Sequence, residues 1–84
     1  MVVDSTRTMP PIGELLDRAG RLRADAHLMD GYARRLLATA AALTGCTAAP
    51  EGSRPALERQ AAACSTAAEQ LRIAAEALLA HARA

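Results

Sequence analysis

The apolar residues between positions 12 and 43 recur in alternating steps of three and four, the spacing of a heptad-patterned helix that packs along one seam. After Ile12, the larger seam residues are Leu15, Leu22, Met29, Leu36 and Leu43, and the alanines between them are Ala19, Ala26, Ala33 and Ala40. A second stretch repeats the pattern with Leu57, Cys64, Leu71 and Leu78 alternating with Ala61, Ala68, Ala75 and Ala82. The pattern predicts an all-α fold, an antiparallel two-helix hairpin with an Ala/Leu heptad seam.

Helix-breaking residues separate the two seam segments. Pro11 fits the first position of a helix, where a missing N–H costs nothing. The sequence GCTAAPEG is the one interior stretch rich in Gly and Pro, so Gly45 should end the first helix and Ser53 should cap the second. The predicted parts are a flexible N-terminal arm (1–11), a helix (12–44), a connection (45–52) and a helix (53–83), with 12–84 forming a single helical-hairpin domain.

The dipeptide Asp30-Gly31 is typical of a turn, so a break of the first helix into two is an alternative. The seam keeps its phase from Met29 through Ala33 to Leu36, which a turn would normally disrupt. This favours one continuous helix. Acidic residues four positions before arginines support it at Glu14/Arg18, Asp17/Arg21 and Asp30/Arg34.

The two seams also predict a register. Pairing positions whose numbers sum to 97 gives eight layers, from Leu15/Ala82 to Ala40/Leu57, and each layer sets a larger seam residue opposite an alanine, with Cys64 opposite Ala33. Small side chains opposite large ones allow two helices to approach closely.

Charge and composition exclude some classes of partner. The net charge is +1, which is too small to attract nucleic acids or anionic membranes strongly. Acidic neighbours neutralise the arginines of the first helix, and Tyr32 is the one aromatic residue available for base stacking. We therefore expect a solvated, salt-bridged face rather than a nucleic-acid site at Arg18, Arg21, Arg23, Arg34 and Arg35.

The cellular location is predicted from the lack of a signal-peptide pattern and of a membrane-spanning segment in the sequence. Residues 1–9 include Asp4 and Arg7 and have no apolar core, unlike a secretory signal peptide. The longest uncharged run, 36–50, is shorter than the roughly 20 apolar residues of a membrane-spanning helix. We expect a soluble cytoplasmic protein without a membrane span, with export lacking a signal peptide as an alternative.

Few residues are candidates for chemistry. Cys64 occupies a seam position and should be a buried small hydrophobe, whereas Cys46 lies in the connection, where an intermolecular disulfide is an alternative. His27 and His81 lie outside the seam, and no Cys/His spacing or Glu-x-x-His motif indicates a metal site. No nucleophile–base arrangement is visible. We expect no enzyme activity, cofactor or metal.

One hairpin cannot cover all of its large apolar residues. Those that lie off the seam form the predicted partner interface, which consists of Leu16, Leu28, Tyr32, Leu37, Ile73 and Leu79. We expect a homodimer or higher homo-oligomer, or pairing with a second helical-hairpin protein, that completes a four-helix bundle.

An alanine-rich hairpin of this length resembles the WXG-type small helical-hairpin proteins of actinobacterial type VII secretion over residues 12–83. Where that family has Trp-x-Gly at the bend, this chain has Thr44-Gly45-Cys46 and shares only a glycine. The family's export motif Tyr-x-x-x-Asp/Glu is absent, because Tyr32 is followed four residues later by Leu36. The resemblance implies a four-helix bundle and export with a partner.

The expected function is therefore a non-catalytic protein–protein interaction module that acts through helix–helix packing as a homo- or hetero-oligomer, and the resemblance implies a type VII secretion-like role. Two alternatives are a small regulatory bundle that binds a ligand, or a metal through Cys64 or His27, and a nucleic-acid-associated protein that uses an arginine-rich face.

Overall fold

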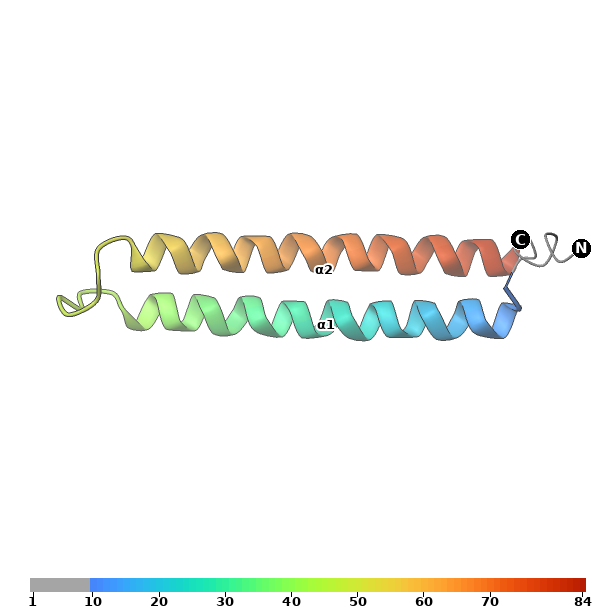
Figure 1. The fold of residues 1–84 in the computed structure, drawn as a ribbon, viewed down its shortest axis with the longest axis horizontal. Helices are drawn as coiled ribbons and strands as arrows, with labels where there is room; N and C mark the ends of the chain where they lie inside the picture. The colour runs from blue at the N-terminus through green and yellow to red at the C-terminus, as the bar shows by residue number, and fades with distance from the viewer. Residues whose placement is uncertain (1–9) are drawn as a thin grey trace, which may run out of the picture.

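Two long helices lie side by side in opposite directions and are joined at one end (Figure 1). The computed structural model describes residues 10–84, in which α1 spans Ile12–Ala42 and α2 spans Ser53–Arg83. The predicted all-α helical hairpin is confirmed. The predicted N-terminal arm lies outside the described residues apart from Pro10 and Pro11.

Helix α1 runs without interruption through Asp30 and Gly31, as the unbroken seam phase predicted. Its N-terminus is set by Pro11, which is the residue before the helix rather than its first residue. Pro11 has extended backbone angles (φ −57°, ψ 148°), and its carbonyl accepts hydrogen bonds from the N–H groups of Glu14 and Leu15 at 2.9 and 3.1 Å. Proline suits this position because it has no N–H to leave unpaired and disfavours helical backbone before it.

Helix α1 ends at Ala42, two residues before the predicted Thr44. Leu43 is the C-terminal cap and its N–H still bonds back to the carbonyls of Thr39 and Ala40. The chain then turns through Gly45 at φ +74°, a conformation that side chains disfavour, and the Cys46 N–H bonds to the Leu43 carbonyl at 3.0 Å. The helical backbone therefore ends at Ala42, one residue before the last seam residue, Leu43.

The start of α2 differs from the prediction in the residue that caps it. Gly52 precedes the helix with left-handed backbone (φ 87°, ψ −4°), and its carbonyl accepts the Ala56 N–H at 3.1 Å. Ser53 is already helical, and its hydroxyl donates back to the Pro50 carbonyl at 2.7 Å. The prediction that Ser53 is the N-cap is wrong, because its hydroxyl serves the preceding turn instead of accepting from a following N–H.

The buried core of the described residues is made almost entirely of alanine. It comprises Leu15 and the seam alanines Ala19, Ala26, Ala33, Ala40, Ala61, Ala68 and Ala75. The other larger seam residues, from Leu22 to Leu43 and from Leu57 to Leu78, are half-buried. This division follows from close helix approach, since alanine brings the backbones together and, except at Leu15 near the start of α1, leaves the larger side chains no room directly between them. The longer side chains lie along the edges of the seam, with their outer sides in water.

The hairpin is elongated and one helix pair thick, with extents of 66 × 26 × 14 Å. Its radius of gyration is 19.3 Å, whereas a compact domain of this length would have about 12 Å. Among residues 10–84, no large side chain is completely buried. Each helix thus has one helical neighbour and exposes most of its circumference.

The first prediction concerns the close packing of the seam. Ala68→Leu should lower the free energy of unfolding by about 1–3 kcal/mol, because Ala68 has no exposed surface and the added carbons must push the helices apart. Ala80→Leu, on the exposed outer side of α2, is the control and should change it little. Urea unfolding followed by circular dichroism measures both, and equal effects would contradict a tightly packed seam.

The second prediction separates helical from turn glycines. Gly31→Ala should raise the free energy of unfolding by about 0.5–1 kcal/mol, because a Cβ there would meet only the Arg34 guanidinium at 3.8 Å. Gly45→Ala should lower it by about 1 kcal/mol, since the positive φ strains any side chain. Thermal unfolding of the two variants would show the opposite order if α1 were broken at Gly31.

Candidate interaction surfaces

The heptad pattern gives the hairpin two flat faces, one on each side of the seam. Residues that directly follow a larger seam residue, such as Arg23, Asp30 and Arg72, lie on one face. Residues that directly precede a seam alanine, such as Tyr32 and Ala67, lie on the other. The structure gives these faces different chemistry.

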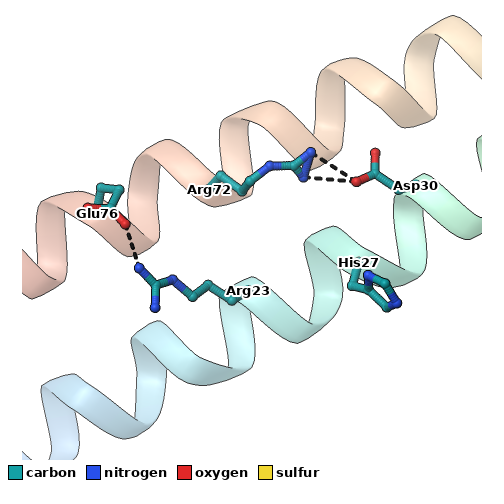
Figure 2. Close-up of a pocket in the computed structure, with 5 residues that line it drawn as sticks. All are labelled: Arg23, His27, Asp30, Arg72 and Glu76. Carbon is teal, nitrogen blue, oxygen red and sulfur yellow. Dashed lines mark hydrogen bonds and ion pairs between the residues drawn. The ribbon is translucent and has the colours of Figure 1, made fainter.

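The first face, which we call the ionic face, is defined by two ion pairs that join the helices (Figure 2). Arg23 donates to Glu76 at 2.6 Å, and Arg72 donates through both terminal nitrogens to Oδ2 of Asp30 at 3.0 and 2.9 Å. The numbers of the paired residues sum to 99 and 102. The predicted register has a sum of 97, so the paired residues are offset from it along the helix axis by at most five residues, or about 8 Å at 1.5 Å per residue.

The sequence spacing had predicted that Asp30 pairs with Arg34. In the structure Asp30 pairs instead with Arg72 on the other helix. The reason is that the Asp30 side chain is only 31% exposed at the edge of the seam. From there its Oδ2 accepts from two nitrogens of the Arg72 guanidinium on α2, two charge-assisted hydrogen bonds that converge on one oxygen. Glu14 and Arg18 do form their predicted pair along α1, at 2.7 Å.

The ionic face has no unpaired cationic cluster at its centre. A shallow depression there is lined by Arg23, Asp30, Arg72, Glu76 and His27. Its two arginines and two carboxylates bond one another, and the His27 ring lies on the side of α1 that faces away from α2 (Figure 2). Both arginines already form ion pairs with carboxylates, so the depression is poorly suited to binding an anion.

The second face, which we call the tyrosine face, carries an apolar groove of about 390 Å³. Its lining residues are Met29, Tyr32, Arg35, Leu36, Thr39 and Cys64. The Arg35 guanidinium carbon lies 4.9 Å from the centre of the Tyr32 ring, a cation–π contact that holds the ring at the groove. Cys64 contributes to this lining from α2, and the other five residues come from α1.

The six residues of the predicted partner interface do not share one surface. Five are exposed and Leu79 is half-buried. Leu28 and Tyr32 lie one turn apart on the tyrosine face. Leu16, Leu37 and Leu79 lie on the ionic face, toward the two ends of the hairpin. Ile73 lies on the outer side of α2.

The sequence-based interpretation missed the groove residues Arg35 and Thr39 and the pair Arg23–Glu76. The signal was present, because these residues sit beside the seam where the two helices come within reach of each other. Arg23 and Arg35 were expected only as members of a solvated, salt-bridged face, and the partner interface was predicted from apolar side chains alone.

The other predicted candidates are dispersed. Cys64 is half-buried and Cys46 is exposed, and both are free thiols. His27 and His81 are exposed. Within residues 10–84, no group of three His, Cys, Asp or Glu side chains is arranged to hold a metal ion, and neither helix has an apolar stretch suited to crossing a membrane.

The arginines of α1 likewise have different partners on different sides of the helix. Arg18 bonds Glu14, Arg23 bonds Glu76, and Arg35 lies over Tyr32. A nucleic-acid surface needs several cations that converge on one backbone. The arrangement of α1 distributes them instead.

No protein-family model, curated protein or solved structure matches this chain. The similarity to the WXG-type hairpins is therefore one of architecture, a pair of long antiparallel helices.

The third prediction tests the cross-helix pairing of Asp30. Reversing the pair with Asp30→Arg and Arg72→Asp should restore most of the stability that either single change removes. The expected coupling is about 0.2–1 kcal/mol, because both side chains are partly exposed. A matched comparison uses alanine variants, which make no new ion pair: the cycle of Asp30→Ala with Arg34→Ala should give a smaller coupling than the cycle of Asp30→Ala with Arg72→Ala, and the reverse order would reassign the partner of Asp30.

Proposed function

We propose that this chain is a non-catalytic interaction module that packs one helical face against a second helical hairpin, either a copy of itself or another protein. The observation that supports this most directly is the composition of the core. Among the described residues, the buried set is seven alanines and Leu15, and no large side chain is completely buried.

The isolated hairpin leaves much of its large apolar surface in water. Folding an isolated domain relies on burying large apolar side chains, each of which contributes about 1.5–3 kcal/mol when fully covered. Here most of the larger seam residues are only half-buried, and Leu28 and Tyr32 are 54% and 42% exposed. A second pair of helices packed on one face would bury these side chains, which would then form the core of a four-helix bundle.

The narrower proposal is a type VII secretion-like hairpin that pairs with a partner. It is supported by the antiparallel architecture and by Gly45, which turns the chain at the bend where the WXG-type family has its glycine. This version predicts a hetero-partner of similar size and helix content.

The fourth prediction is that helicity depends on association. Sedimentation equilibrium of the reduced protein, with circular dichroism of the same samples, should show a helical dimer or tetramer that loses helicity as it dissociates on dilution. A poorly helical monomer at all concentrations would direct the search to a different chain as partner. A fully helical monomer that stays monomeric at high concentration would contradict the proposal.

A further inference from the structure

We infer that the tyrosine face binds a second copy of this chain, with the two hairpins stacked face to face and both connections at the same end. The inference rests on the proposed function and adds to it the buried face, the identity of the partner and the orientation of the pair. Three features of the structure lead to it.

The first feature is the groove itself. It lies at the edge of the seam, where half-buried Met29, Leu36 and Cys64 meet exposed Tyr32. Leu28, one turn before Tyr32, is 54% exposed on the same side of α1. This side of α1 therefore presents large apolar side chains beside a hollow.

The second feature is the absence of charge on the α2 side of the same face. Between positions 60 and 77, the residues on this side are Gln60, Ala63, Ala67, Gln70, Ala74 and Ala77. Charged residues of this part of α2 lie on the opposite side, at Glu69, Arg72 and Glu76. The α2 side thus offers a small and neutral surface next to the large side chains of α1.

The third feature is that only one of the two stacking orientations matches these surfaces. If the connections lie at opposite ends, α1 stacks on α1 of the partner, which sets large side chains against large ones and brings Arg18 level with Arg35. The α2 helices then set alanine against alanine and leave space unfilled. Both the like charges and the mismatch of volumes disfavour this orientation.

With the connections at the same end, α1 of each copy lies on α2 of the other. Residues at the same level then have numbers that sum to about 97, as they do within the hairpin. Tyr32 comes level with Ala63 and Ala67 of the second copy, which leave room for its ring. This arrangement sets large side chains against small ones, as the seam does.

In this orientation, charged side chains of α1 lie opposite neutral polar side chains of α2 of the second copy. Arg35 comes level with Gln60, and Asp25 with Gln70. A glutamine amide can accept from a guanidinium through its oxygen and donate to a carboxylate through its nitrogen. Both charges on this part of the face therefore meet a group of matching hydrogen-bonding type.

The area of the face is sufficient for a stable dimer. Each 31-residue helix is about 46 Å long at 1.5 Å per residue, and the hairpin is 26 Å wide. One face then offers on the order of 1,000 Å², so the pair buries about 2,000 Å², at the upper end of the standard range for specific interfaces.

The orientation is tested with spin labels at Cys46 in full-length protein that carries Cys64→Ala, after circular dichroism and sedimentation equilibrium have shown that the variant stays helical and dimeric. The expected separation of the two labels is on the order of 20–30 Å, set by layers about 10 Å apart and the linkers of the labels. Connections at opposite ends would place the labels about the length of the hairpin apart, 66 Å, and would overturn the inferred orientation.

The face is tested with a matched pair of variants. Ala63→Arg places a cation level with Arg35 of the second copy and should weaken dimerisation at least tenfold in sedimentation equilibrium. Ala62→Arg, one residue earlier on the side of the ionic face, is the control and should leave the dimer constant unchanged. Both alanines are exposed in the hairpin, so neither change disturbs its seam.

The outcomes distinguish this inference from the function on which it rests. A dimer broken by Ala62→Arg and not by Ala63→Arg would overturn the choice of face and leave the interaction module intact. A chain that associates only with a different protein would overturn the identity of the partner alone. A stably helical monomer would overturn both.

Discussion

The close approach of two helix backbones along a row of alanines is the constraint on which the rest of this structure depends. Ala68 and Ala75 have no exposed surface, so nothing larger fits at these points of the seam. Apart from Leu15, the larger seam residues are therefore displaced to the edges, where part of each side chain remains in water. The same packing makes the hairpin thin and leaves two broad faces beside the seam.

These two faces differ because of how their polar groups are satisfied. On the ionic face, Arg23 and Arg72 bond carboxylates of the opposite helix, so the charges neutralise one another across the hairpin. On the tyrosine face, Arg35 lies against Tyr32, and the α2 side is alanine and glutamine. In the inferred pair, covering the tyrosine face desolvates no charge of α2 between positions 60 and 77, and the charges of Asp25 and Arg35 on α1 come level with glutamine amides.

The ends of the helices show where local sequence rules compete. Ser53 and Gly52 are both acceptable caps, and the serine was predicted because its hydroxyl can accept a backbone N–H. In the structure the hydroxyl donates to Pro50 instead, and the glycine takes the left-handed position that closes the turn. Two alternatives that differ by a small free energy cannot be ranked from residue preferences alone. At Gly45, only a residue without a side chain takes the positive φ readily, and the prediction of a break there was correct.

The sequence by itself determined the helix pair, its antiparallel direction and the continuity of α1 through Gly31, because hydrophobic periodicity and the breaker-rich connection are properties of the local chain. Only the tertiary structure decided that Asp30 bonds Arg72 and not Arg34, that Arg35 and Thr39 line a groove, and that the exposed apolar residues divide between faces. Each of these depends on what the opposite helix presents at the same level. Competing contacts along one helix are worth only a few tenths of a kcal/mol, so a neighbour across the seam is enough to redirect a side chain.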